Sequence, residues 1–273
     1  MKSILFLTNF SSAANHAIRN FAKTFGPKLA GRYNLILINA WKQPRTGHFQ
    51  MINLDEYLAE ISSIDLKREA EFIINELKWP RKNLKLVSKK GEITDVVKQL
   101  TKVHHPELIV FGTKGTNLFR EIVAGSTTGR ILRQIKVPTL LIPESAQNNT
   151  CDKIVFATDL QECRNKDDFE KLTGLVRKMM ADFLILHVYT EEKPNVDKFE
   201  QCMEPFLSGI NYSFHYEQHV NIESGIIEFV SNMQAGLLAL IGRKDDLLIQ
   251  LLKHSVTQGI VQRASVPLLI IHE

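Results

Sequence analysis

The feature that most constrains the fold of this chain is an internal repeat. Four apolar segments of the first half return in the same order in the second half, the first of them 150 residues later. The matched pairs are residues 4–10 and 154–160, 35–40 and 183–188, 107–112 and 237–242, and 137–142 and 266–271. Such ordered self-similarity indicates a tandem duplication. The polar segment 144–150 lies at the join, as a linker does, so we predict one domain over 1–144 and a second over 150–273.

The apolar segments alternate with helical patterns within each half. They are nearly continuous runs of Ile, Leu, Val and Phe, which is typical of strands buried on both faces of a parallel sheet. In the first half, helical periodicity begins after Ser11, stops near Gly26, returns over about 55–79 and appears again over 94–103. With a further strand at 84–87, this pattern predicts an α/β fold in which each half holds five parallel strands with helices on both faces.

Composition limits the classes of function. With 44% hydrophobic and 23% charged residues, the 273-residue chain has enough apolar material for two globular cores. Its net charge of +4 comes from scattered Lys and Arg residues, which argues against a nucleic-acid partner. Three cysteines without ligand or disulfide spacing predict no metal site and fit a reducing compartment. The apolar run at 4–7 is too short for a signal peptide or a membrane span, so we expect a cytoplasmic protein without a membrane partner.

A glycine motif follows the strand predicted at 108–111. Gly112 and Gly115 come directly after it, and Gly125 leads through 126–128 into a helical pattern. The order strand, glycine loop, helix N-terminus favours an anion site, because such a terminus carries unpaired N–H groups and glycine lets the backbone approach a ligand. The motif is neither a Walker loop nor a dinucleotide fingerprint. Four cationic residues surround the loop, each of which alone is more typical of a surface charge: Lys114, Arg120, Arg130 and Arg133.

The spacing Gly-x2-Gly-x9-Gly-Ser resembles the nucleotide-binding signature of the ATP-binding universal stress proteins, and Thr-Asn-Phe-Ser at 8–11 resembles that family's Thr-Asp-Phe-Ser. The resemblance implies two tandem doubly wound domains of the adenine nucleotide alpha hydrolase-like type, paired along their last strands as a built-in dimer. It also implies an adenine nucleotide (ATP, with ADP or AMP as alternatives) accompanied by Mg²⁺. The implied binding residues are Thr8, Asn9, Phe10, Ala40, Gly112, Thr113, Gly115, Gly125, Ser126, Thr127 and Thr128.

Asn9 departs from the family pattern. In the family, the Asp of the first loop contacts the adenosine part of the nucleotide, and an amide at Asn9 lacks the charge of that carboxylate. A neutral hydrogen bond contributes about 0.5–1.5 kcal/mol, against about 1.5–3 kcal/mol for one to a charged group. We therefore expect weaker nucleotide binding in the first half, but not its loss.

The second half departs in the opposite way. It keeps Asp159 in its first loop and Gly242 after its fourth strand, but Asp245 and His254 align with Gly115 and Gly125 of the first half. Carboxylates near a phosphate site repel the ligand. Although Ser255 and Thr257 remain, we predict that this half does not bind a triphosphate and serves to complete the architecture.

Three functions remain open on these grounds. The leading hypothesis is a universal stress protein that binds ATP in its N-terminal domain and acts as a stress-response or regulatory protein on an unknown protein partner. No motif places a catalytic residue, so at most slow ATP hydrolysis is expected. The second is an interaction scaffold that needs no nucleotide. The third, an ATP-using enzyme of the same superfold, would require a Ser-Gly-Gly-type loop after the first strand, which residues 8–12 lack. Whether two tandem chains form a homodimer is also open.

Overall fold

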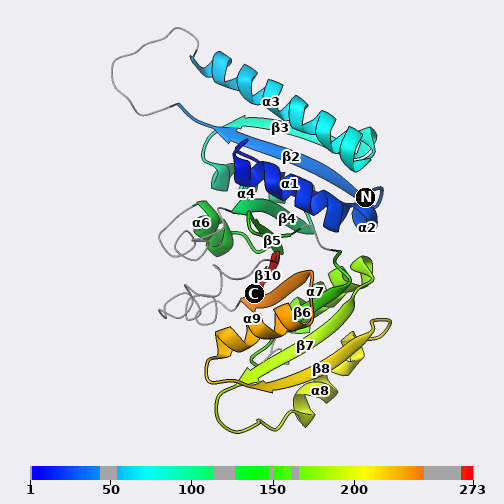
Figure 1. Ribbon diagram of the computed structural model, residues 1–273. Helices are drawn as coiled ribbons and strands as arrows, with labels where there is room; N and C mark the ends of the chain where they lie inside the picture. The colour runs from blue at the N-terminus through cyan, green and yellow to red at the C-terminus, as the bar shows by residue number, and fades with distance from the viewer. Residues whose placement is uncertain are drawn as a thin grey trace.

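The computed structural model of the protein describes residues 2–43, 54–113, 127–147, 150–160, 166–242 and 266–272 (Figure 1). The strands of the first half are β1 (Lys2–Leu7), β2 (Tyr33–Trp41), β3 (Leu84–Lys90), β4 (Leu108–Thr113) and β5 (Thr139–Pro143). Those of the second half are β6 (Lys153–Ala157), β7 (Asp182–Tyr189), β8 (Tyr212–Gln218), β9 (Leu237–Gly242) and β10 (Leu268–His272). The helices are α1 (Ser12–Thr24), α2 (Gly26–Leu29), α3 (Leu54–Leu77), α4 (Ile93–His104), α6 (Thr127–Gln134), α7 (Lys166–Met179), α8 (Asp197–Met203) and α9 (Ile222–Asn232).

Within the described residues, ten strands form one sheet in the order β3-β2-β1-β4-β5-β10-β9-β6-β7-β8. The first five are parallel to one another, and so are the last five. Each half has the same order, with its first strand between its second and its fourth. This confirms the α/β fold with two doubly wound parallel halves.

The two halves join through their last strands, as the resemblance implies. β5 and β10 pair antiparallel, with Leu141 opposite Leu268 and Thr139 opposite Ile270. The sheet therefore continues from one half into the other without a break in its hydrogen bonding (Figure 1). Because the pairing covers an edge strand of each half, it satisfies backbone groups that an isolated half would expose.

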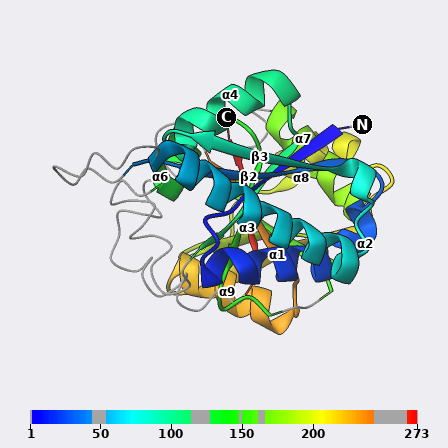
Figure 2. The same ribbon diagram turned by 90° about the horizontal axis from the view of Figure 1, so that it is seen from above.

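The core follows from the alternation of side chains along the strands. In β1, Ile4 and Phe6 point to one face of the sheet, whereas Leu5 and Leu7 point to the other. The first face carries one cluster of buried side chains that runs through both halves, with Phe21 of α1 packed 5.8 Å from Phe6, ring centre to ring centre. Figure 2 shows α1 and α3 on one side of β2 and α4 on the other. Both faces are thus covered, which explains why the strands read as continuous apolar runs.

Local signals in the sequence explain some of the helix ends. Ser11 caps α1 by accepting a hydrogen bond from the backbone N–H of Ala14. α1 does end before Gly26, but Gly26 begins the short helix α2 instead of a loop, and Pro27 lies in its first turn, where proline is tolerated. In the second half, α8 ends at Met203 and the chain continues as a 3₁₀ turn over Glu204–Phe206. No helix of the described ranges is both long enough and apolar enough to cross a membrane.

Gly112, at the end of β4, is explained by packing against α1. A Cβ added there would lie 2.2 Å from the backbone oxygen of Ala13 and 2.9 Å from the Cβ of Ala17. The shortest contact is with the backbone, which cannot rotate away as a long side chain does. Glycine at this position therefore lets α1 lie directly on β4, beside the carboxyl end of the neighbouring β1.

We predict that Gly112→Ala lowers the free energy of unfolding by about 1–3 kcal/mol, because the added methyl group overpacks the contact with α1. Gly174→Ala is the matched control. It lies inside α7, where an added Cβ meets nothing within 4 Å. The control should raise stability by about 0.5–1 kcal/mol, because alanine favours a helix over glycine. Urea unfolding followed by circular dichroism measures both, and equal stability of Gly112→Ala and the parent chain would contradict the packing argument.

Candidate functional site

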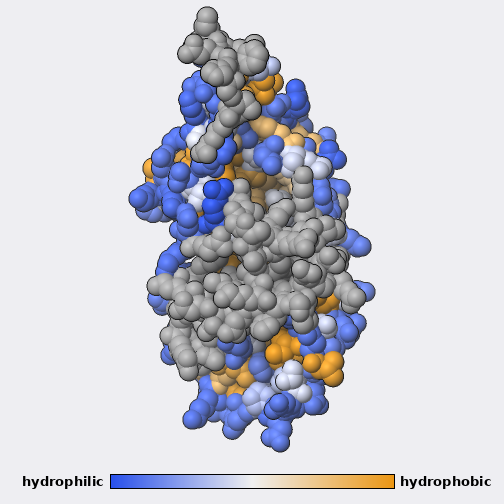
Figure 3. Space-filling model, turned by 90° about the vertical axis from the view of Figure 1, so that its left-hand side faces the viewer, coloured by the Kyte–Doolittle hydropathy of each residue, from blue (hydrophilic) through white to orange (hydrophobic). Residues whose placement is uncertain are grey.

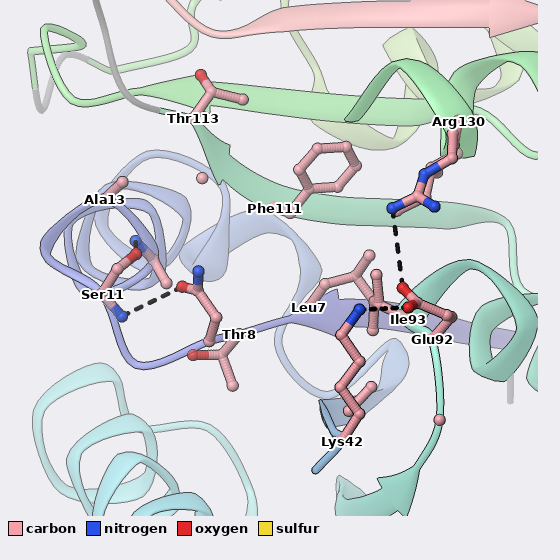
Figure 4. Close-up of a pocket in the computed structure, with 16 residues that line it drawn as sticks. Leu7, Thr8, Ser11, Ala13, Lys42, Glu92, Ile93, Phe111, Thr113 and Arg130 are labelled. Carbon is pink, nitrogen blue, oxygen red and sulfur yellow. Dashed lines mark hydrogen bonds and ion pairs between the residues drawn. The ribbon is translucent and has the colours of Figure 1, made fainter. Parts of the chain in front are cut away.

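A cavity of about 600 Å³ opens at the carboxyl ends of β1, β2 and β4. The strand order reverses between β1 and β4, and open α/β sheets bind their ligands at such a point. The N-terminal end of α1, the turn before α4 and one side of α6 complete the lining (Figure 4). In the space-filling view, an apolar floor framed by hydrophilic residues is visible in the upper half of the molecule (Figure 3).

The loop after β1 has a fixed backbone conformation. Phe10 has a positive φ of 61°, which is unusual for a bulky residue. The hydroxyl oxygen of Thr8 accepts a hydrogen bond from the N–H of Phe10 at 3.1 Å, and the side-chain oxygen of Asn9 accepts one from the N–H of Ser11 at 3.2 Å. These two bonds close the turn and hold Asn9 at the wall of the cavity.

The second half repeats this turn after β6. Leu160 has a φ of 66°, and its N–H donates to the hydroxyl oxygen of Thr158 at 2.8 Å. The duplication has therefore preserved the backbone of the loop, while Asn9 in the first half corresponds to Asp159 in the second.

A buried amide anchors the start of the first loop. The side-chain nitrogen of Asn39 donates to the backbone oxygen of Thr8 at 2.9 Å, and its oxygen accepts a bond from the hydroxyl of Ser62 at 2.8 Å. In the second half, Nδ1 of His187 lies 2.8 Å from the backbone oxygen of Thr158. Because a carbonyl only accepts, Nδ1 of His187 carries the proton in this contact. Different side chains thus hold the same backbone group.

The N-terminal end of α1 faces the cavity. Ser11, Ala13 and Ala14 belong to the lining, and the hydroxyl of Ser11 caps the helix. The first N–H groups of a helix have no partners within it, and the helix dipole places a partial positive charge there. This side of the cavity therefore suits an acceptor or an anion.

Two cations and a carboxylate lie on another side of the cavity. Lys42 follows β2, Glu92 precedes α4 and Arg130 lies on α6. The ammonium group of Lys42 is paired with Oε1 of Glu92, and Nη2 of Arg130 lies 3.8 Å from Oε2 of Glu92 (Figure 4). These three side chains carry a net positive charge into the lining.

The structure brings together five of the binding residues predicted from the sequence. They line the cavity: Thr8, Asn9, Ala40, Gly112 and Thr113. The side chain of Phe10 instead packs against the core cluster of α1 and α3. Thr127 and Thr128 begin α6, and nothing is described of their side chains.

The remaining residues of the predicted motifs lie outside the described residues. In the first half these are Gly115, Gly125 and Ser126, and in the second half Asp245, His254, Ser255 and Thr257. Gly242 ends β9. The assignment of the glycine loop to phosphates therefore stays a prediction.

Sequence reasoning missed Lys42, the turn at 91–93 and Glu69. The first two could have been predicted from the sequence, since they directly follow the second and third strands, and the carboxyl ends of parallel strands meet at one edge of the sheet. Glu69 gives no such signal, because it lies in the middle of α3 and follows no strand end.

Glu69 is a partly buried carboxyl beside the first loop. Its Oε1 accepts a hydrogen bond from the hydroxyl of Thr8 at 3.0 Å, and its Oε2 is buried with no partner among the residues that the structure describes. Burial raises the pKa of Glu69 to about 7, the charge of Asp65 acts in the same direction, and the bond from Thr8 opposes both. The hydroxyl that closes the loop turn is thus also bound to a group that titrates near neutral pH.

We predict that this carboxyl makes stability depend on pH. The folded protein holds a proton that the unfolded chain releases above its ordinary pKa of 4.5, so stability is fully present below that pH and falls as the pH rises through about 7. Glu69→Gln cannot lose a proton. Its free energy of unfolding relative to the parent should therefore rise by about 1–2 kcal/mol between about pH 5 and pH 8, after allowance for partial exposure.

Urea titrations at several pH values measure this difference. Glu71→Gln is the control, since it removes an exposed carboxylate, paired with Arg81, from the same helix and changes the net charge equally. Parallel pH curves for Glu69→Gln and the parent would show that Glu69 is not protonated in the fold.

In the described part of the chain, no group of three or more His, Cys, Asp or Glu side chains is placed to hold a metal ion.

Comparison with known proteins places the fold. The family model described as "Universal stress protein family" matches residues 1–143. A universal stress protein from Archaeoglobus fulgidus DSM 4304 superposes with a TM-score of 0.69 at 17% identity, over 99% of this chain and 96% of that one. A functionally unknown protein from Pseudomonas aeruginosa PAO1 superposes with a TM-score of 0.59 at 12% identity, over 100% and 92%. No curated protein sequence matches significantly.

At these identities the solved structures show a shared fold and nothing finer. The family match is stronger, because it spans more than half of the chain and includes every strand from β1 to β5. The chain belongs to the universal stress protein family.

Proposed function

We propose that the first half binds one adenine nucleotide, ATP accompanied by Mg²⁺, in the cavity at the carboxyl ends of β1, β2 and β4. The bound nucleotide changes the surface that the protein presents to a protein partner during a stress response. The family match supports this proposal, because it covers the half that contains the cavity.

The observation that carries the proposal is the polar character of the cavity wall. The volume of about 600 Å³ lies within the range of small-molecule sites, about 300–1,000 Å³. Thr113 lines the cavity, and its hydroxyl is buried without a hydrogen-bond partner among the described residues. With the N-terminal end of α1 on one side and two cations on another, the cavity fits a ligand that combines acceptor groups with negative charge.

The residues then divide by the part of the nucleotide that they contact. Asn9 takes the adenosine part and the backbone at Ala40 lies against the base, as the family resemblance implies. Gly112 and Thr113 stand where the phosphate loop begins, and the motif residues of that loop take the phosphates. Mg²⁺ is held by the phosphates.

Binding without fast turnover fits the groups that line the cavity. A general base must lie within hydrogen-bonding reach of the water that it activates. The carboxylate that the described lining contains, Glu92, is engaged with Lys42 and Arg130. We therefore assign the cavity to nucleotide binding and the response to a change of surface.

Asn9→Asp tests the proposal. The new carboxylate still accepts the N–H of Ser11 and adds a charged acceptor for the ligand. We expect tighter binding of Mg-ATP by about 1 kcal/mol, or about fivefold in Kd, measured by calorimetry on protein freed of nucleotide. Asp159→Asn, the corresponding position of the second half, is the matched control and should leave affinity and stoichiometry unchanged.

Two results would contradict the proposal. If Asp159→Asn removes heat of binding, the second half holds the nucleotide. If neither the parent nor Asn9→Asp binds ATP, ADP or AMP, the chain acts as an interaction scaffold without a nucleotide.

A further inference from the structure

We propose that Glu92 determines the selectivity of the cavity, because its carboxylate competes with the phosphate groups of the ligand for Lys42 and Arg130. A ligand with a single phosphate displaces this carboxylate poorly, whereas a triphosphate displaces it well. The inference rests on the proposed function for the identity of the ligand. It assigns selectivity to Glu92, Lys42 and Arg130, which do not belong to the glycine motif.

The backbone forces Glu92 and Lys42 together. The N–H of Gly91 donates to the backbone oxygen of Trp41 at 2.8 Å, which ties the turn before α4 to the end of β2. Trp41 pairs with Lys90 in the register of β2 and β3, so the next residues leave the two strands side by side. The ion pair between Lys42 and Glu92 is therefore set by the sheet, and both side chains belong to the lining.

Glu92 extends into the cavity instead of capping its own helix. It occupies the N-cap position of α4, but its side chain accepts no capping bond within the described residues. Its backbone oxygen accepts the N–H groups of Asp95 and Val96. The carboxylate lies at the cavity wall, where Figure 4 shows it between Lys42 and Arg130.

Arg130 is only loosely engaged by Glu92. Its Nη2 lies 3.8 Å from Oε2, which is an ion pair but too long for a hydrogen bond. Its Nε is buried and has no hydrogen-bond partner in the described ranges. A guanidinium with donors to spare matches the oxygens of a phosphate group, which it binds through two parallel bonds.

The exposure of the pair makes the competition reversible. The side chains of Lys42 and Glu92 are 63% and 38% exposed, and solvent weakens such pairs. Each additional phosphate group adds negative charge and further acceptor oxygens. The cations therefore transfer from the carboxylate to a polyphosphate more readily than to a monophosphate.

The test compares four proteins by calorimetry at fixed pH and salt: the full-length parent, Glu92→Gln, Arg130→Gln and Asp55→Asn. The last is the matched control. Asp55 forms an ion pair with Lys90 near the same rim, is 43% exposed and does not belong to the lining, so Asp55→Asn removes the same charge from outside the cavity. The probes are Mg-ATP, AMP and inorganic tripolyphosphate, and a thermal melt of each variant confirms folding.

We expect Glu92→Gln to tighten the binding of ATP and tripolyphosphate by about threefold. Its effect on the affinity for AMP should be smaller than its effect on the affinity for ATP, because the single phosphate of AMP recruits fewer of the freed donors. Arg130→Gln should weaken ATP and tripolyphosphate by about tenfold, because it removes hydrogen bonds to a charged group. Asp55→Asn should leave all three affinities unchanged.

The outcomes separate this inference from the proposed function. Weaker ATP binding by Glu92→Gln, or an equal change for ATP and AMP, would overturn the competition and make Glu92 a contact of the nucleoside. If no protein binds ATP or AMP but Glu92→Gln strengthens tripolyphosphate, the nucleotide assignment fails and the competition stands. If tripolyphosphate binds none of the four proteins and ATP affinity is equal in the parent and Glu92→Gln, the competition is overturned.

Discussion

The position of the cavity depends on the faces of the sheet to which the chain crosses after two neighbouring strands, β1 and β4. After β1 the chain crosses to α1 on one face of the sheet, whereas after β4 it crosses to α6 on the other face. The two strands are neighbours, so a crevice forms at their carboxyl ends, with α1 on one side and α6 on the other. Gly112, which packs against α1, forms part of one wall of this crevice, and the turn at Gly91 forms part of another. The cavity is a consequence of topology before any ligand residue is considered.

The two halves share this scaffold and differ in what they attach to it. The positive φ at Phe10 and Leu160, the threonine hydroxyl that closes each turn and the bond to the threonine carbonyl occur in both. Asn39 and His187 make that last bond with different chemistry. Since this loop conformation and its hydrogen bonds are retained where the side chains have diverged, we infer that they stabilise the fold. The side chains around this backbone are free to differ between the halves, as Asn9 and Asp159 do.

Much of the architecture was predictable because it depends on local patterns. Continuous apolar runs located the strands, Ser11 marked the start of α1, and the repeat located the second half. The part of the site that follows strand ends was partly predictable, as Asn9, Ala40, Gly112 and Thr113 show. Contacts between residues that are far apart in the sequence were not predictable. Thr8 meets Glu69 across 61 positions, and Lys42 meets Glu92 across 50, with nothing in either local sequence to indicate a partner. The role of Gly112 in packing was hidden for the same reason, since the clash that excludes a side chain comes from another element.

We propose above all that the duplicated scaffold holds one nucleotide, in its first half. The most direct measurement saturates the purified full-length protein with Mg-ATP, removes the excess, denatures the protein and quantifies the released adenine nucleotide by mass spectrometry. We expect one nucleotide per chain. Two per chain would show that the second half also binds, and none would show that the cavity does not hold an adenine nucleotide.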